Sequence, residues 1–138
     1  MSRTQEVIER FAAALDRDDF DAAAALLRDD CRYESPIGPI IGAQPIIDSY
    51  RSASEWARTH LDEIIYESRC RLESADRGIV LFVDHLRHNG RTHSYRCQQI
   101  VTVDAAGQIT RIEHDELPGE REAVDVFLRG VGVDRRIS

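Results

Sequence analysis

Residues 79–103, IVLFVDHLRHNGRTHSYRCQQIVTV, decide the fold because they predict two long strands joined by a tight turn. Asn89-Gly90, in the middle of this segment, is a strong signal for a two-residue β-hairpin, since both residues tolerate the positive φ angles of the favoured turn. Such a hairpin fixes which residues of the two strands lie opposite one another. The predicted pairs are His88 with Arg91, Leu86 with His93, Asp84 with Tyr95, and Phe82 with Cys97.

The elements on either side of this hairpin follow from apolar spacing, turn residues and helix caps. The predicted helices cover about residues 1–15, 20–27, 42–57 and 120–128. The further predicted strands cover residues 31–35, 60–73 and 108–117. Helices followed by a meander of long strands indicate an α+β fold, in which three N-terminal helices pack on a curved antiparallel sheet.

The composition limits the classes of function. The chain has 138 residues, which suits one domain, and its formal net charge of −7 disfavours nucleic acid as a partner. It contains no lysine, which excludes a Schiff-base lysine or a P-loop, and no G-x-G-x-x-G motif for a dinucleotide. Cys31, Cys70 and Cys97 lack the paired spacing of a disulfide framework or a zinc site. We therefore predict no cofactor and no metal.

The sequence also lacks the signals of a membrane or secreted protein. No apolar run approaches the roughly 18 residues of a bilayer span, and the N-terminus has no signal-peptide core. We expect no membrane partner and a cytoplasmic location.

Alternation along the strands sorts the side chains onto two faces of the sheet. With Ala105-Ala106 at the tip of the next turn, Tyr95 is predicted to face Glu116, Cys97 to face His114, and Gln99 to face Ile112. One face is then mainly apolar and is expected to look toward the helices; its members are Val80, Phe82, Asp84, Leu86, Tyr95, Cys97, Gln99, Val101, Ile112, His114 and Glu116. The alternate residues of the last two strands are polar and belong to solvent.

Polar groups in the middle of the inward face are candidates for chemistry. Tyr66, Asp84, Tyr95 and Glu116 are predicted to form one row across four strands. Burial of a carboxylate beside tyrosines raises its pKa and makes it a usable acid or base, and a histidine titrates near neutrality. We therefore predict Asp84, Tyr95 and His114 as catalytic residues. The structural alternative is that Asp84 and Tyr95 satisfy each other and that His114 is a hydrogen-bonded core residue.

The neighbouring side chains are expected to bind the ligand. The predicted ligand-binding residues are Tyr33, Ser35, Tyr50, Trp56, Tyr66, Phe82, Leu86, Cys97, Gln99, Ile112 and Glu116. Tyr50 and Trp56 lie on the third predicted helix, where a core role is the alternative. Glu34 alternates outward, so it is a poor candidate for chemistry.

The outer face keeps one apolar corner, made of Ile79, Leu81, Val83 and Ile100. Because a monomer rarely leaves such a patch bare, we predict a homodimer through the outer face of the sheet. The alternative is that the helix over residues 120–128 covers it.

Three stretches taken together resemble the nuclear transport factor 2-like superfamily, which includes ketosteroid isomerases and SnoaL-like polyketide cyclases. They are VIERFAAALDRDDFDAAAALLRDD, YESPIGPIIG and GQITRIEHDEL, in that order. The resemblance covers about residues 4–117, leaving a C-terminal helix and tail over residues 118–138. It implies a cone of helices against a bent sheet, with a pocket at the wide end.

The catalytic residues of a ketosteroid isomerase are not present in this sequence. That enzyme uses an aspartate as base, with a tyrosine and a protonated aspartate as the oxyanion hole. Ser35 stands at the base position, Phe11 at the tyrosine position and Gln99 at the protonated-acid position. In SnoaL-like cyclases the base is an acid near the end of the sheet. His114, Asp115 and Glu116 lie in that region, and a bulge would be needed to turn Asp115 inward.

We predict a pocket protein for a small, apolar, carbonyl- or hydroxyl-bearing molecule. Its chemistry, if any, would be cofactor-free proton transfer, as in an isomerase, dehydratase or cyclase, with Tyr95 and Gln99 donating to an oxyanion. The alternative is a non-catalytic binding or dimerisation module. A limonene-type epoxide hydrolase is a third option, and it would need Arg96 or Arg111 inside the pocket.

Overall fold

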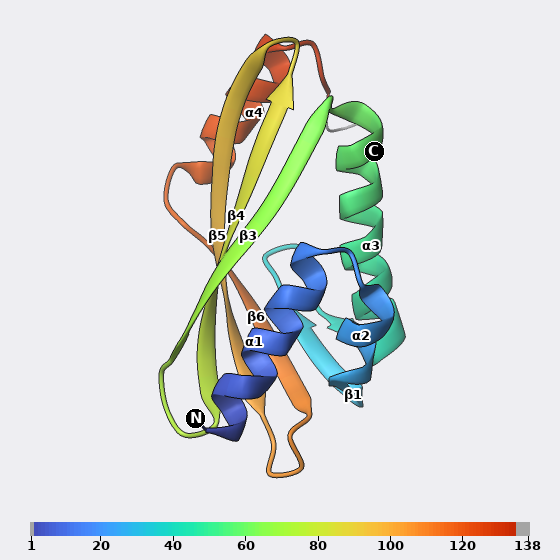
Figure 1. Cartoon of the computed structure of the whole chain (residues 1–138), viewed down its shortest axis with the longest axis vertical. Helices are drawn as coiled ribbons and strands as arrows, with labels where there is room; N and C mark the ends of the chain where they lie inside the picture. Colours follow the sequence, from blue (N-terminus) through green and yellow to red (C-terminus); the bar gives the residue numbers. More distant parts are fainter. Residues whose placement is uncertain (1, 135–138) are drawn as a thin grey trace.

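The computed structural model describes residues 2–134 and confirms the α+β fold (Figure 1). The described helices are α1 (Arg3–Asp16), α2 (Phe20–Ala25), α3 (Ala43–His60) and α4 (Glu120–Gly130). The strands are β1 (Leu27–Glu34), β2 (Ile40–Ile41), β3 (Glu63–Leu72), β4 (Arg77–His88), β5 (Arg91–Val103) and β6 (Ile109–Glu116). Residues 135–138 of the predicted C-terminal tail lie outside the described part of the chain.

Side-chain caps start the first two helices. Ser2 Oγ accepts a hydrogen bond from the Gln5 amide over 3.1 Å, and Asp19 Oδ1 accepts one from the Ala22 amide over 3.2 Å. The inner side of α1 is fully buried at Ile8 and Phe11. The apolar spacing of α1 therefore places the apolar side of the helix against the sheet.

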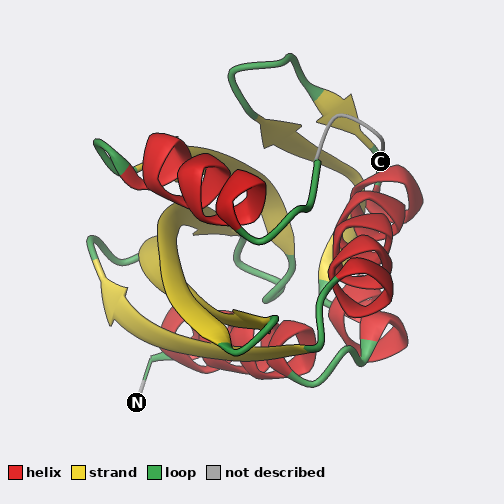
Figure 2. Cartoon of the chain, turned by 90° about the horizontal axis from the view of Figure 1, so that it is seen from above, coloured by secondary structure: helices red, strands yellow, loops and turns green. Residues whose placement is uncertain are grey.

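The six strands form one twisted open sheet in the order β2-β1-β6-β5-β4-β3 (Figure 2). The sheet is mixed, which corrects the prediction of an antiparallel sheet. β1 runs parallel to β6, with Tyr33 opposite Ile112. No turn links these two strands, because α3 and four strands separate them in the chain. Hairpin signals therefore could not reveal their pairing or direction.

The central hairpin has the predicted register. His88 pairs with Arg91, Asp84 with Tyr95, and Phe82 with Cys97. Asn89 takes a left-handed conformation with φ of 50°, as the turn requires. Tyr66 pairs with Asp84 on the other side. The predicted row of Tyr66, Asp84 and Tyr95 is therefore confirmed.

The register between β5 and β6 was predicted wrongly by two residues. Cys97 lies opposite Glu116, Gln99 opposite His114, and Val101 opposite Ile112. Glu116 is therefore in the row of Cys97 and not in the row of Asp84. Since the error is an even number, every side chain keeps its predicted face.

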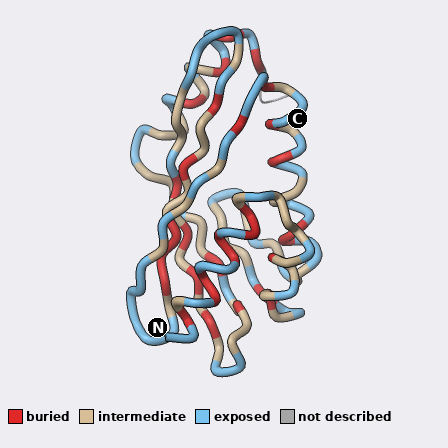
Figure 3. The backbone as a smooth tube through the Cα atoms, viewed as in Figure 1, coloured by how far each residue is buried: buried red, intermediate tan, exposed pale blue. Residues whose placement is uncertain are grey.

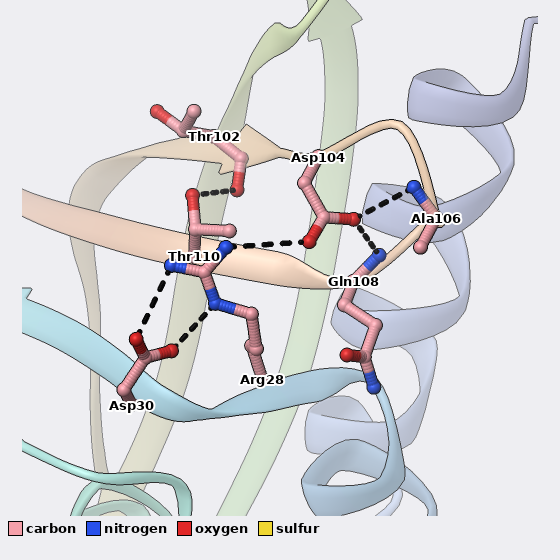
Figure 4. Close-up of polar contacts among 7 residues, drawn as sticks. All are labelled: Arg28, Asp30, Thr102, Asp104, Ala106, Gln108 and Thr110. Atoms are coloured by element: carbon pink, nitrogen blue, oxygen red, sulfur yellow. Dashed lines mark hydrogen bonds and ion pairs between the residues drawn. The ribbon is translucent and has the colours of Figure 1, made fainter.

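The error arises in the turn that precedes β6 (Figure 4). Asp104 Oδ1 accepts hydrogen bonds from the backbone amides of Ala106 (2.9 Å) and Gln108 (3.0 Å), which closes a wider turn than the predicted two-residue tip. An irregularity beside Val103 then leaves Thr110 as an extra residue in β6. Asp104 Oδ2 lies 3.5 Å from Arg28 of β1, so the turn is also tied to the parallel strand.

Two apolar clusters pack on the inner face of the sheet. The first joins α1 to β4 and β6 around Phe11, Val80 and Ile112. The second joins the end of α3 to α4 around Ala57, Leu86 and Leu128. Buried and half-buried positions alternate along β5 from Cys97 to Val103, and buried stretches recur along the other central strands (Figure 3).

The predicted apolar corner on the outer face is partly covered. Ile79 and Val83 are buried, and Leu81 and Ile100 are half-buried. The C-terminal helix α4 does not explain this, because its buried Val124 and Leu128 pack in the cluster of Leu86 on the inner face. The alternative prediction, in which this helix covers the corner, is therefore wrong.

Candidate functional site

A cavity of about 450 Å³ opens between the inner face of the sheet and the helices. β3, β4 and β5 supply its floor, α3 supplies a wall with Tyr50 and Trp56, and α4 closes over it with Val124 and Leu128. Nine predicted site residues line this cavity: Tyr50, Trp56, Tyr66, Phe82, Asp84, Leu86, Tyr95, Cys97 and Gln99.

The other predicted site residues lie outside its lining. Tyr33 and His114 stack on each other, with ring centroids 6.4 Å apart, and Ile112 is fully buried in the core. Ser35 Oγ donates to the carbonyl of Gly38 over 3.1 Å, within the loop after β1. Glu116 binds Arg121 of α4 over 2.6 Å. The predicted site residues of β1, of the loop after it and of β6 therefore do not line the cavity.

Asp84 is the most perturbed acid in the cavity. It lies between Tyr66 and Tyr95 on the neighbouring strands. The residue is half-buried, because one side of it faces the cavity. Burial, with a smaller contribution from the negative charge of Asp16, raises the pKa of Asp84 to about 7. A carboxylic acid with that pKa gives up and takes back a proton near neutral pH.

Two further acids, Asp16 and Asp18, line the same cavity and were missed by the sequence analysis. Asp16 ends α1 and accepts a hydrogen bond from Ser68 Oγ over 2.6 Å, and burial raises its pKa. Asp18 follows in a left-handed conformation with φ of 57°. Its place after the helix was visible in the run DRDDF, but the run resembles an ordinary solvated helix end.

A polar network holds Asp18 in this uncommon conformation. Its two carboxylate oxygens accept from Ser54 Oγ at 2.9 and 3.0 Å, and Arg58 Nε donates to Oδ2 over 2.6 Å. Tyr66 in turn donates to Ser54 Oγ over 3.0 Å. The network therefore links α3 to the strand that carries Tyr66 and fixes that ring beside Asp84.

Gln99 of β5 is a second polar group in the cavity lining and is 3% exposed. Tyr50 donates to Gln99 Oε1 over 2.6 Å, which turns the amide nitrogen toward His114 Nδ1 at 3.2 Å and Tyr33 Oη at 3.3 Å. Burial lowers the pKa of His114, so its neutral form is favoured. Gln99 therefore stands between His114 and the cavity.

The arginines named for an epoxide hydrolase do not enter the cavity. Arg96 and Arg111 are exposed on the outer face. Asp115 is also exposed there and accepts from Gln98 Nε2 over 2.7 Å. The irregularity in β6 lies at Thr110 and leaves Asp115 facing outward.

The described part of the chain contains no group of three or more histidine, cysteine, aspartate or glutamate side chains placed to hold a metal ion. Within residues 2–134, each helix is too short or too polar to cross a bilayer.

Comparison with known proteins places this architecture. The family model described as a SnoaL-like domain matches residues 8–112. The chain belongs to the SnoaL-like family. The fold is that of the nuclear transport factor 2-like superfamily, which confirms the resemblance seen in the sequence. The curated proteins gave no match.

Solved structures with this fold carry several descriptions. A putative polyketide cyclase from Xanthomonas campestris pv. campestris is 20% identical, with a TM-score of 0.67 over 88% of this SnoaL-like chain and 95% of that one. A Mycobacterium tuberculosis protein in complex with estradiol-17β-hemisuccinate is 19% identical, with a TM-score of 0.64 over 87% and 98%. An LEH-like epoxide hydrolase from M. tuberculosis is 20% identical, with a TM-score of 0.61 over 92% and 96%.

Proposed function

We propose that this SnoaL-like protein binds a small, mostly apolar molecule with a carbonyl or hydroxyl group, and that Asp84 exchanges a proton with it. The observation that carries the proposal is an acid with a pKa of about 7 on the floor of a 450 Å³ cavity, between two tyrosines. Cavities of this size with an apolar lining and a few polar groups are typical of small-molecule sites.

The geometry favours Asp84 over His114 as the group that transfers the proton. Asp84 lines the cavity, whereas His114 is separated from it by the amide of Gln99. Tyr66 and Tyr95 flank Asp84 on the neighbouring strands, and both line the cavity. Asp84 would act as the base, and the Tyr95 hydroxyl would donate to the developing oxyanion.

The reaction class that fits these groups is cofactor-free isomerisation, dehydration or aldol-type cyclisation. Each of these needs a proton removed next to a carbonyl and returned elsewhere, which one acid of intermediate pKa performs. The description of a structural neighbour as a putative polyketide cyclase supports the same class.

Exchange of carbonyl-adjacent protons provides the test. 2-Tetralone in deuterium oxide, followed by NMR at neutral pH, should lose its α-protons faster with the protein than with buffer. Asp84→Asn should reduce the protein-dependent rate at least ~100-fold. The matched control is Asp29→Asn, which removes an equal charge at an exposed site of β1 outside the cavity lining, and it should leave the rate unchanged. An undiminished rate in Asp84→Asn would refute the role of Asp84.

The second candidate is a non-catalytic binding module. The hydrogen-bonded state of Gln99, Tyr50 and His114 favours it, because these groups are already satisfied within the chain. This candidate predicts that 2-tetralone quenches the fluorescence of Trp56, which lines the cavity and is the single tryptophan of the chain, without any exchange of its α-protons.

We also propose that two copies pair through the apolar corner of the outer face. Leu81 and Ile100 remain half-buried at its centre. Leu81→Glu would place a charge there and should convert a dimer into a monomer in analytical ultracentrifugation. A monomeric wild-type protein at ~100 µM would refute the pairing.

A further inference from the structure

We propose that the cavity prefers ligands that also carry a protonated nitrogen, so that an apolar amine binds there with Asp84 as its counterion. The inference rests on the ligand-binding part of the proposed function and is independent of the proton transfer. It follows from the charge, the hydrogen bonding and the aromatic character of the cavity lining.

The described lining carries three carboxylates, on Asp16, Asp18 and Asp84, and it contains no arginine, lysine or histidine. Asp18 is neutralised by Arg58, whose Nε lies 2.6 Å from its carboxylate. Asp16 and Asp84 have no such cation among the described residues. They are close enough that the charge of Asp16 acts on Asp84. The lining supplied by residues 2–134 therefore has an excess of negative charge.

Asp84 keeps hydrogen-bonding capacity for a ligand. Within residues 2–134 no hydrogen bond or ion pair involves its carboxylate, and the half-buried residue lines the cavity. Oδ1 of Asp16 also has no hydrogen-bond partner in this part of the chain, but it is fully buried, so Asp16 contributes only its charge. A partly buried carboxylate without a partner is costly, whereas an ammonium group supplies both the positive charge and the donors that it lacks.

Aromatic rings surround the same point. Tyr66 and Tyr95 flank Asp84, and Trp56 and Phe82 also line the cavity. The negative face of an aromatic ring attracts a cation, and an apolar ring wall accepts the hydrocarbon body of the ligand. The chain itself shows this preference, because the guanidinium of Arg58 lies 5.4 Å from the ring centre of Tyr66. An ammonium bound at Asp84 would have a counterion and aromatic faces together.

A charge series on one hydrocarbon body tests this inference. We would titrate 1-adamantanamine, 1-adamantanol and 1-adamantanecarboxylate at pH 8 into the full chain and follow the emission of Trp56, the single tryptophan. The amine should bind about tenfold more tightly than the alcohol, and the carboxylate should bind most weakly. Asp84→Asn should reduce the preference for the amine to less than about threefold, while Asp29→Asn should keep it.

The outcomes separate this inference from the proposed function. If the alcohol binds as tightly as the amine, or if Asp84→Asn keeps the tenfold preference, the amine inference is wrong and the apolar cavity stands. If none of the three compounds binds, the proposed ligand-binding function fails as well. Should Asp84→Asn fail to fold, the order of affinities in the wild-type chain still decides the question.

Discussion

The amide nitrogen of Gln99 lies 3.2 Å from Nδ1 of His114 and keeps that imidazole out of the cavity. Because Gln99 acts as the donor here, Nδ1 of His114 must be unprotonated, and the proton of the neutral ring sits on Nε2, 3.8 Å from Glu116 Oε1. A second proton on the ring would break the hydrogen bond to Gln99.

We expect the folded protein to show a pKa for His114 below 6.5, because burial lowers it. The unfolded chain then binds more protons between the two pKa values, so the contribution of His114 to stability is complete above about pH 6.5 and is lost as the pH falls through the folded pKa. NMR titration of the imidazole protons measures the value. A pKa above 6.5 would show that the hydrogen bond to Gln99 does not hold the neutral form.

We expect Gln99 to stabilise the fold as the hydrogen-bond acceptor of the buried Tyr50 hydroxyl. In Gln99→Met the Tyr50 hydroxyl loses its acceptor in an enclosed site, which should cost about 1–3 kcal/mol of unfolding free energy. Tyr50→Phe in the same chain should recover part of that loss, because it removes the unsatisfied hydroxyl. Urea denaturation of the two single variants and the double variant measures the coupling. Strictly additive losses would contradict the hydrogen bond.

Asp84 should reduce stability as the pH rises. Its pKa of about 7 in the folded protein exceeds the ordinary value of 3.8, so the folded state binds more protons between these values and the unfolding free energy falls with increasing pH over that range. Asp84→Asn removes this penalty. Its advantage over wild type should grow by about 2 kcal/mol between pH 5 and pH 7.5 and then level off, allowing for water in the cavity.

Chemical denaturation at several pH values measures this difference. Asp29→Asn is the control, since the carboxylate it removes is exposed. An advantage of Asp84→Asn that is constant across the pH range would show that Asp84 titrates near its ordinary pKa.

Gly78 marks the point where α1 lies directly on β4. A Cβ atom there would come within 2.3 Å of Ile8 Cδ1 and 3.2 Å of the Arg71 carbonyl. Gly78→Ala should therefore cost about 1–3 kcal/mol, and Ile8→Val should relieve part of that cost by removing the clashing methyl group.

Gly130→Ala is the matched substitution at an exposed site, where the nearest atom belongs to a flexible side chain. Its nearest atom would be Arg91 Nη1 at 3.4 Å, and alanine favours the helical backbone of α4, so stability should be unchanged or slightly higher. Thermal unfolding of the variants compares them. Equal melting temperatures for Gly78→Ala and wild type would contradict the close packing of α1 on β4.

The sequence predicted the fold class and the face of each inward residue because both depend on local signals. Asn89-Gly90 set the register of β4 and β5, and the alternation of Phe82, Asp84 and Leu86 set their face. One failure depended on a strand distant in the chain, and the other on which of several possible turn lengths Asp104 selects. The parallel partner of β1 has no local signal, and the wide turn after β5 is set by where the Asp104 carboxylate finds its backbone donors.

Some residues of the candidate site could be predicted from the sequence and others could not. Residues on the central strands were predicted to reach the cavity and do line it, as Asp84 and Tyr95 illustrate. Asp16 and Asp18 could not be recognised, because their inward position depends on the left-handed backbone at Asp18 and on Ser54 and Arg58 from a distant helix. Their roles as ligand contacts remain predictions.

The parallel pairing of β1 with β6 has a consequence for biosynthesis. A ribosome releases β1 early, yet its neighbour in the sheet is among the last segments to emerge. Until then one edge of β1 has no partner, and the apolar side chains of β1 that pack in the same cluster as Ile112 stay in contact with water. We therefore expect nascent chains that stop before β6 to be held by chaperones or degraded, and the pocket to form only after translation is nearly complete.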